Sequence, residues 1–481
     1  MEQIPKITEK KIQKKFIVAL ISISLLAMLN MTTVTMALPT YIEEFKISLN
    51  AAQWVTIGYM LPLGMLMPLA GYLGERYSYR KVFLYGLIVM GVASVACACA
   101  TNFYLLVLFR FFKGMAAGIL IPNAMGMLYR YIPKQYQAPY LGELVLVQSV
   151  GIALGPTLSG FILQVSSWPL LFLINVPVVL LAYIIGRECI PVEEGTKNGS
   201  IDFFGIVQIS LGTALVMIAF TEGDQWGWKS PLFLSVTAFG LFLMVTFFVR
   251  QLHTKNPLLN LKVLKYRPFT LALLIQCTFA LTMGITAILL QLYFQTVRGY
   301  SPAETGLFVL IPSLGMMLGN EISNKLHGKA PIRVLLVFSM AITVIGNLAW
   351  CHLTVTSSII LLILFFTIRY TGMGMLQMPL TDYGLGCIPI ELSGHASAMF
   401  NWSREFTTVI ATNVLTVLMS FNLNRYYLEA GNTGIPTEGT LSYNIAASHA
   451  VGTDFVYMTF FLVLSLIVTF FIKPYGKEAW K

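Results

Sequence analysis

Charged residues are scarce in this chain. Asp, Glu, Lys and Arg make up 11% of its 481 residues and hydrophobic residues make up 57%, whereas about a quarter of the residues of a soluble domain are charged. So few charges exclude a protein whose surface faces water throughout. The stretches between the apolar runs are also too short to bury cores of their own. We therefore expect a protein that is embedded in a lipid bilayer.

The sequence also lacks the motifs of several other classes of protein. It contains no G-x-x-x-x-G-K-[ST] loop, which an ATP-driven pump needs to bind phosphate. Its six cysteines have neither the spacing of a disulfide framework nor that of a zinc site. The apolar runs contain no clustered His, Asp and Glu, and no Ser and Lys pair, of the kind that a membrane-embedded enzyme or channel would need. We expect no enzyme, no metal and no cofactor, so the energy for any transport must come from an ion or substrate gradient.

The net charge of +10 has two possible explanations. A basic chain can bind nucleic acid, but no RNA-binding signature or basic stripe accompanies the charge here. In membrane proteins, Lys and Arg gather in the cytoplasmic loops. We therefore expect no nucleic-acid partner.

Fourteen apolar runs are long enough to cross a bilayer as helices, which takes about twenty residues each. The first is too long for the apolar part of a signal peptide, and no cleavage site follows it. The runs are 16–38, 53–73, 82–100, 104–129, 139–163, 168–186, 203–221, 231–249, 268–294, 303–323, 331–352, 356–378, 394–421 and 453–472.

The placement of Lys and Arg agrees with this count. If the N-terminus is cytoplasmic, 23 of the 31 Lys and Arg residues fall in cytoplasmic segments, 4 in outside segments and 4 within spans. This bias predicts that both termini are cytoplasmic. The runs form an N-terminal six-helix bundle (1–187), an inserted pair of helices with flanking loops (188–267) and a C-terminal six-helix bundle (268–481). Two six-helix halves are typical of transporters that bind substrate where the halves meet.

A short charged segment lies between the second and third runs. Its residues of interest are Gly71, Glu75, Arg76 and Arg80. By charge alone this is an ordinary cytoplasmic loop, but its order resembles the G-x-x-x-D-R-x-G-R-R signature of the major facilitator superfamily. Glu75 stands for the Asp, and Ser78 and Tyr79 replace a Gly and an Arg. The resemblance implies that the segment locks one gate of a transporter.

The fourth run carries two cations on one helix face. Arg110, Lys113 and Gly114 are spaced at i, i+3 and i+4. An Arg at this depth faces a cavity or caps backbone carbonyls. The segment resembles the superfamily's R-x-x-Q-G-x-G-A-A signature, with Lys113 in place of the Gln. That resemblance implies that Arg110 takes part in proton coupling.

The fifth run contains a stripe of small residues. Its members are Gly142, Gly151, Gly155, Pro156 and Gly160. Such a stripe can be a general helix-packing face, and Pro156 should bend the helix. The full spacing resembles the g-x8-G-x3-G-P-x2-G-G signature of antiporters in the superfamily, with Ser159 as one departure. This resemblance implies export rather than import.

Segments elsewhere point to a subfamily. The segments at 29–39, 202–205, 257–261 and 299–302 are similar to those of the fourteen-span drug:proton antiporters, so the resemblance covers essentially the whole chain. Asn30, however, takes the place of that family's membrane Asp. Because an amide cannot exchange a proton near neutral pH, proton coupling must use another residue.

The thirteenth run carries a polar stripe on one face. The stripe includes Ser397, Asn401, Arg404, Thr408 and Thr412, and Glu405 lies beside it. In a helix surrounded by lipid, such a stripe belongs against a wet cavity. We predict that Glu405 carries or shares the coupled proton. The alternative is that it forms a structural ion pair with Arg369 or Arg110, and Asp382 is then the next candidate.

Together these features predict a major facilitator fold, with two six-helix bundles and two inserted helices. The expected function is export of lipophilic or amphipathic compounds (multidrug efflux) across the plasma membrane in exchange for protons, without a need for oligomers. An alternative is export of an endogenous lipid, fatty acid or signalling metabolite. The four cations within the spans favour neutral or anionic cargo for either function.

Overall fold

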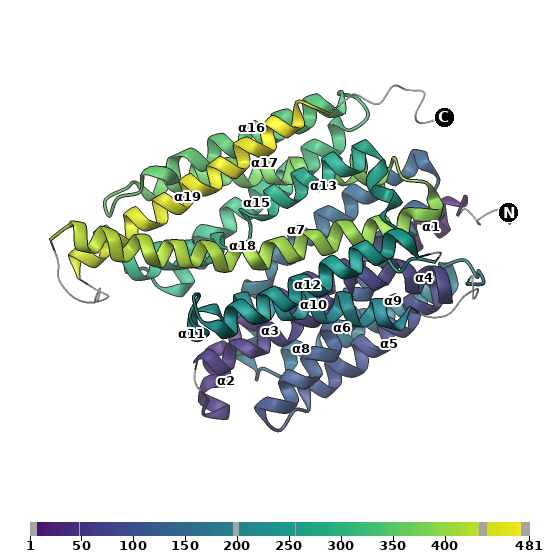
Figure 1. Cartoon of the computed structure of the whole chain (residues 1–481), viewed down its shortest axis with the longest axis horizontal. Coiled ribbons are helices and arrows are strands. Elements are labelled where there is room, and N and C mark those ends of the chain that lie inside the picture. The colour runs from purple at the N-terminus through teal and green to yellow at the C-terminus, as the bar shows by residue number, and fades with distance from the viewer. Residues whose placement is uncertain (1–6, 48, 196–201, 255, 432–439, 473–481) are drawn as a thin grey trace. The chain divides into compact units, whose positions relative to one another are not determined.

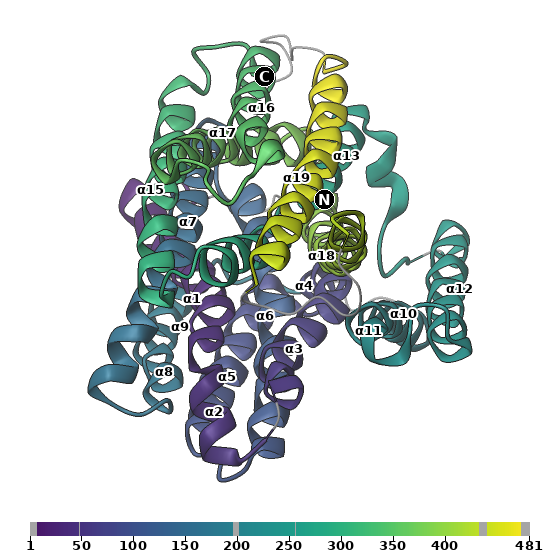
Figure 2. The ribbon, with the colours of Figure 1, turned by 90° about the vertical axis from the view of Figure 1, so that its left-hand side faces the viewer.

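A computed structural model describes residues 7–47, 49–195, 202–254, 256–431 and 440–472. Apart from turns and one isolated bridge between His327 and Ala330, the regular structure of these residues is helical (Figures 1 and 2). The all-helical class is therefore confirmed for the part of the chain that is described. Contacts divide the chain into two units. The first is Met1–Ala219, Leu234–Phe269 and Leu385–Trp402, and the second is Phe220–Phe233, Thr270–Gly384 and Ser403–Lys481.

The first unit holds most of the N-terminal helices. They are α1 (Lys10–Thr32), η1 (Val34–Ala37), α2 (Leu38–Phe45), α3 (Leu49–Leu66), η2 (Met67–Leu69), α4 (Ala70–Tyr77), α5 (Tyr79–Ala98), α6 (Phe103–Tyr131), α7 (Lys134–Val165), α8 (Leu170–Leu173), α9 (Asn175–Cys189), most of α10 (Phe203–Thr221) and α12 (Pro231–His253), η3 (Leu261–Lys265), η6 (Ile390–Leu392) and the start of α18 (Ser393–Glu429).

The second unit holds the remaining helices. They are α11 (Gly223–Trp226), most of α13 (Arg267–Ala280), α14 (Thr286–Gln291), the π-helical η4 (Leu292–Val297), α15 (Pro302–Leu326), α16 (Ile332–Leu348), η5 (Ala349–His352), α17 (Ile359–Leu385), the rest of α18 and α19 (Leu441–Thr469).

Twelve helical stretches of the described chain have the length and apolar composition of a membrane span. Two of the fourteen predicted runs are not among them. The run 139–163 lies within α7, a helix of 32 residues in which the side chains of 152–154, 156 and 157 are not described. The run 268–294 is divided among α13, turns at 281–285, α14 and η4. The structure thus has the helices of a multi-pass membrane protein, with two fewer qualifying spans than predicted.

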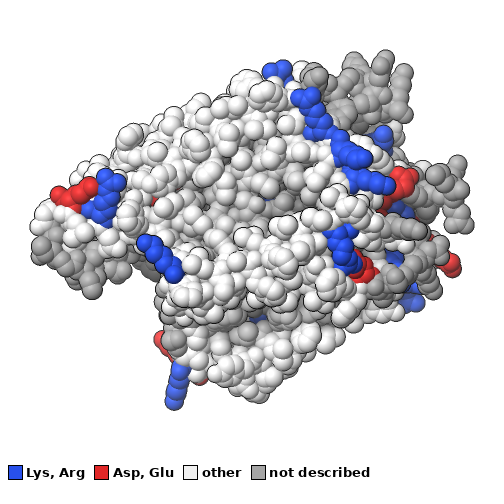
Figure 3. All heavy atoms as spheres, in the orientation of Figure 1, with Lys and Arg blue, Asp and Glu red and all other residues white. Residues whose placement is uncertain are grey.

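The outer faces of these helices are apolar. Tyr85 of α5 is 67% exposed, Phe242 of α12 is 61% exposed and Phe460 of α19 is 66% exposed. On the face drawn in Figure 3, Lys, Arg, Asp and Glu lie toward the helix ends, and the surface between them is almost entirely uncharged. A surface of this kind is stable against hydrocarbon rather than water.

Four segments of the first unit meet at one end of its helices. Arg130, at the end of α6, pairs with Glu193 after α9 at 3.2 Å. Lys15 of α1 pairs with Glu188 of α9 at 3.3 Å, and Arg80 at the start of α5 donates to the carbonyl of Arg187. The segments that we predicted to be cytoplasmic in this unit therefore share one end.

Within the first unit, the helices α10 and α12 pair with each other, and α10 packs against α3. An added Cβ at Gly212 of α10 would lie 3.0 Å from the carbonyl oxygen of Gly240 in α12, so the two backbones are close. An added Cβ at Gly64 of α3 would lie 3.0 Å from the sulfur of Met217 in α10. Glycine at these positions permits close helix packing in the membrane.

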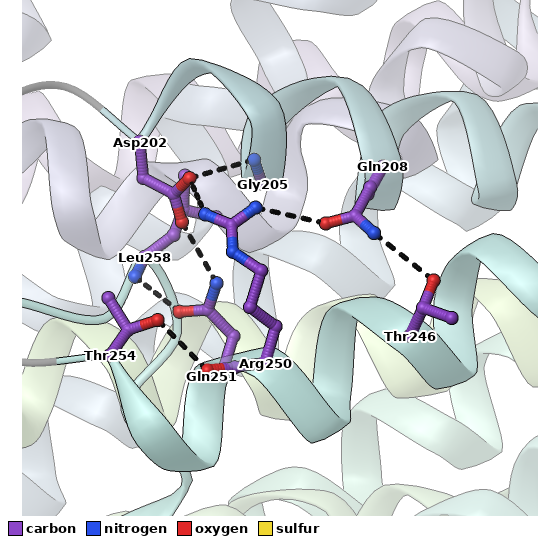
Figure 4. Close-up of polar contacts among 8 residues, drawn as sticks. All are labelled: Asp202, Gly205, Gln208, Thr246, Arg250, Gln251, Thr254 and Leu258. Carbon is purple, nitrogen blue, oxygen red and sulfur yellow. Dashed lines mark hydrogen bonds and ion pairs between the residues drawn. The ribbon is translucent and has the colours of Figure 1, made fainter.

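A cluster of polar side chains links the start of α10 to the end of α12 (Figure 4). The carboxylate of Asp202 accepts from the backbone N–H of Gly205 at 2.9 Å, from the amide of Gln251 at 3.1 Å and from the guanidinium of Arg250. Arg250 also donates to Gln208 at 3.1 Å. Burial alone would raise the pKa of Asp202, but the hydrogen bonds from Gly205, Gln251 and Arg250 outweigh it and lower the pKa. The ionised carboxylate therefore fastens the start of α10 to the end of α12.

Replacement of this carboxylate should destabilise the helix pair. Asp202→Asn is expected to lower the free energy of unfolding by about 2 kcal/mol at pH 7, because charge-assisted hydrogen bonds are lost. Since the folded-state pKa lies below the ordinary value of 3.8, the contribution is present above that pH and is lost as the pH falls through the folded-state pKa. The Tm of both proteins in nanodiscs, measured from pH 7 down to pH 3, checks this.

The control for the loss of one negative charge is Glu194→Gln, since Glu194 is exposed. Its Tm should follow that of the wild type at every pH. If Asp202→Asn and the wild type have the same Tm at pH 7, the cluster does not stabilise the pair.

Candidate functional site

The segment 71–80 resembles the cytoplasmic signature of the superfamily, and we call it the signature segment. It packs on the start of α18 within the first unit. An added Cβ at Gly71 would lie 2.5 Å from the carbonyl carbon of Gly394, so only glycine allows the two backbones to approach so closely. Glu75 Oε2 lies 3.1 Å from Nε2 of His395. Ser397 donates to the carbonyl of Pro122 in α6 at 2.8 Å. The segment thus docks on 393–402.

The two departures from the signature have distinct structural effects. Ser78 adopts φ +82° between α4 and α5, a conformation that glycine adopts without strain. Tyr79 is fully buried, and its ring lies 5.1 Å from the guanidinium carbon of Arg130. Arg76 donates to the hydroxyl of Tyr72 at 3.3 Å. Local contacts therefore hold the segment in place.

Sequence analysis did not identify His395 as a site residue. The histidine lies at the start of a long helix, and its partner Glu75 is 320 residues away. A lone histidine at a helix end gives no indication of such a distant partner. Only the packing of α18 on α4 shows the contact.

Arg110 is fully buried and caps backbone carbonyls. Its Nε donates to the carbonyl of Val55 in α3 at 2.7 Å. Its two terminal nitrogens lie 3.4 and 3.5 Å from the carbonyl oxygen of Asn30 in α1. The rings of Tyr59 and Phe172 lie 4.9 and 5.8 Å from its guanidinium carbon. Arg110 therefore caps backbone carbonyls, which was one of the two roles that we considered for it. One of these carbonyls belongs to Asn30.

Asn30 and Lys113 complete this cluster without an acid. Asn30 donates to the carbonyl of Leu26 at 2.7 Å and accepts from Asn175 at 3.3 Å. Lys113 is fully buried, and its Nζ has no hydrogen-bond partner among the residues that the structure describes. It lies 5.1 Å from the ring of Phe172. The cluster therefore holds two cations beside an amide.

Gly114 brings α6 against α3. An added Cβ at Gly114 would lie 2.2 Å from the carbonyl oxygen of Tyr59, and one at Gly118 would lie 2.4 Å from that of Leu63. Two glycines one turn apart thus let the helices touch through their backbones. This contact brings the Arg110 side chain within reach of the Val55 carbonyl.

The small residues of the α7 stripe differ in how closely other atoms pack against them. An added Cβ at Gly151 would lie 2.7 Å from Cβ of Met28 in α1, so the helices are in close contact there. Gly142 and Gly155 are buried, whereas an added Cβ at Gly160 would meet no atom within 4 Å. The side chain of Pro156 lies outside the described residues.

In the polar stripe of α18, most of the hydrogen bonds described run from a side chain to a backbone carbonyl of the same helix. Asn401 is buried and donates to the carbonyl of Ser397 at 2.9 Å. The hydroxyl of Thr408 donates to the carbonyl of Arg404 at 2.9 Å. Glu405 forms an ion pair with its neighbour Arg404 at 3.0 Å, and their side chains are 16% and 21% exposed. Glu405 thus has a structural partner, but it is not Arg369.

Arg369 of α17 is fully buried in the second unit. Its Nη2 donates to the carbonyl of Thr282 at 3.1 Å and to the hydroxyl of Thr286 at 3.0 Å. Within the described part of the chain, its Nε and Nη1 have no hydrogen-bond partner. Unlike Arg110, it therefore keeps most of its donors unused.

Two further acids lie in the second unit. Asp382 is buried and its carboxylate lies 3.0 Å from Nε2 of His327. Asp454 of α19 is fully buried, and neither carboxylate oxygen has a hydrogen-bond partner among the described residues. We did not predict Asp454 as a site residue, because it is only the second residue of the run 453–472. Its position as a lone acid at the start of an apolar run was the only indication.

Comparison with known proteins agrees with this architecture. The lincomycin resistance protein LmrB of Listeria monocytogenes is 27% identical, over 92% of this chain and 93% of the relative. The riboflavin transporter RibZ of Clostridioides difficile is 24% identical, over 91% and 95%. The crystal structure of the human organic anion transporter MFSD10 has a similar fold, with a TM-score of 0.63 at 12% identity over 95% of this chain and 98% of that one. The family model of the Major Facilitator Superfamily matches residues 20–412, and the chain therefore belongs to this superfamily of membrane transporters.

Proposed function

We propose that the protein is a secondary active exporter of lipophilic or amphipathic compounds in the plasma membrane. The direction of transport rests on the α7 stripe that resembles the antiporter signature, and the observation that supports a packing role for this stripe is the contact of Gly151 with α1. A small residue at this point lets α7 and α1 approach each other closely.

We propose that the protein has fourteen spans, with α10 and α12 as an inserted pair between two six-helix bundles. The length of α7 supports one additional span, since 32 residues exceed the roughly twenty that a crossing needs. Together, α13, α14 and η4 support the other.

The names of two relatives favour two different substrate classes. A relative named for lincomycin resistance favours drug efflux. A relative named as a riboflavin transporter favours the alternative of an endogenous metabolite. Three cations, Arg110, Lys113 and Arg369, are buried. They favour neutral or anionic cargo, because each would repel a positively charged compound that came near it.

We propose that the acids of the second unit carry the coupled proton. Asn30 cannot take that role. Glu405 is partly exposed beside Arg404, and Asp454 is buried without a partner in the described chain. Ionisable side chains in such places commonly belong to proton pathways of transporters, so the two acids are the candidates to share the proton.

Overpacking at Gly151 should stop export. Gly151→Leu adds a side chain where a Cβ alone would lie 2.7 Å from Met28, and overpacking of this kind costs about 1–3 kcal/mol. The variant should insert into the membrane but lose efflux from everted vesicles. The matched control is Gly160→Leu, since an added Cβ there meets no atom within 4 Å.

The direction of transport is tested in the same experiment with cells that lack the protein. They should accumulate more of the transported compound than wild-type cells. Lower accumulation would identify an importer, and export by Gly151→Leu at the wild-type rate would contradict the role of the α1–α7 contact.

The docking of the signature segment on α18 should be needed for gating. Gly71→Val would push α4 away from Gly394 at a cost of about 1–3 kcal/mol, which lowers the population of this conformation roughly 5- to 150-fold. Hydrogen exchange of the 393–402 backbone should become faster, and transport should fall. Gly306→Val is the control, since Gly306 is exposed and has no neighbour within 4 Å of an added Cβ. Unchanged exchange and transport in Gly71→Val would refute the gate.

Proton coupling should depend on both acids. Glu405→Gln and Asp454→Asn each remove an ionisable group and keep its size, so both variants should insert normally. In proteoliposomes with a pH gradient, each should lose uphill transport and retain downhill exchange of substrate. Undiminished pH-driven transport in the double variant would place the coupling site elsewhere, whereas loss of both activities in Glu405→Gln would indicate a structural ion pair with Arg404.

A further inference from the structure

The span that begins with α13 is interrupted inside the second unit. α13 ends at Ala280, residues 281–285 form turns, and α14 begins at Thr286. The hydroxyl of Thr282 donates to the carbonyl of Phe279 at 2.8 Å, and that of Thr286 donates to the carbonyl of Thr282 at 2.8 Å. Lipid offers no partner to backbone groups that a helix break releases. A break at this depth is therefore expected to line a binding site or cavity rather than to face lipid.

Arg369 reaches this break from α17. Its Nη2 donates to the carbonyl of Thr282 and to the hydroxyl of Thr286. The rings of Phe366 and Phe455 lie 5.5 and 5.6 Å from its guanidinium carbon. The guanidinium is thus held in position by one nitrogen and two rings, while Nε and Nη1 have no acceptor in the described chain.

The described acids of this unit do not neutralise Arg369. Glu405 pairs with Arg404 at 3.0 Å, and Asp382 lies 3.0 Å from His327. The carboxylate of Asp454 makes no hydrogen bond with a described residue. A buried cation without a counter-charge is costly, and an ionisable side chain within a membrane commonly marks the path of a substrate or ion.

Polar and apolar groups meet at the same break. An added Cβ at Gly284 would lie 1.8 Å from the hydroxyl oxygen of Thr412, so the polar stripe of α18 lies against the turns. The rings of Phe366 and Phe455 beside the guanidinium would give an anionic head group an apolar surface next to it.

We propose that the helix break and Arg369 form a binding site for the carboxylate of an amphipathic compound. The free N–H groups of the guanidinium donate to the carboxylate, since guanidinium and carboxylate are matched in charge and geometry. The apolar body packs against the rings of Phe366 and Phe455, which flank the guanidinium. The site rests on the proposed function only in that its ligand is the transported compound.

Matched pairs of aromatic acids and their amides test this site. Purified protein in nanodiscs is titrated with 2-naphthoate and 2-naphthamide, and then with the corresponding pairs of larger aromatic rings, using intrinsic fluorescence. The wild type is expected to bind the acids at least about tenfold more tightly than the amides, a preference that corresponds to about 1.4 kcal/mol. Arg369→Gln should remove this preference and leave amide binding unchanged. Arg369→Lys should retain part of it.

Arg425→Gln is the matched control, because it removes a cation of the same unit that already has a carboxylate partner, Glu429, at 2.7 Å. It should keep the preference for acids. Equal affinity of acids and amides for the wild type, or a preserved preference in Arg369→Gln, would overturn the proposal. The wild-type comparison decides the question even if Arg369→Gln does not fold. Binding is measured without transport, so a protein that prefers acids but imports them would contradict the export function and leave this site intact.

Discussion

The hydrogen bonds of Arg110 tie together three helices of the first unit. The guanidinium of α6 reaches the carbonyl of Val55 in α3 and that of Asn30 in α1. All three of its nitrogens have acceptors, so the cost of burying the cation is offset by the backbone itself. The geometry depends on Gly114, which lets α6 approach α3 closely enough for the guanidinium to reach these carbonyls. The rest of the first unit packs around this junction.

Arg369 shows the opposite arrangement in the second unit. It is buried as deeply as Arg110, but a broken helix supplies acceptors for only one of its nitrogens. A fully engaged guanidinium stabilises the fold, whereas one with free donors is ready for a ligand. Two buried side chains of the same type thus differ in how many of their nitrogens have acceptors among the described residues.

Glycines determine which helix surfaces can meet. Gly71 brings α4 to the start of α18, and Gly151 brings α7 to α1. The replacement of an acid by Asn30 leaves Arg110 and Lys113 without a carboxylate partner in the described part of the first unit. The two acids that we propose for proton transfer, Glu405 and Asp454, lie in the second unit.

The sequence by itself determined the helical class, most of the membrane spans and the family, because apolar runs, charge placement and short motifs depend only on neighbouring residues. It also predicted that Gly151 allows close helix approach, and it gave the capping of backbone carbonyls as an alternative role for Arg110. Only the tertiary structure decided that Glu75 meets His395 across 320 residues, that turns at 281–285 separate α13 from α14 beside Arg369 and that Asp454 is buried without a described partner. The physical reason is that helix formation is governed by local sequence, whereas the partner of a buried polar group comes from whichever distant helix packs against it.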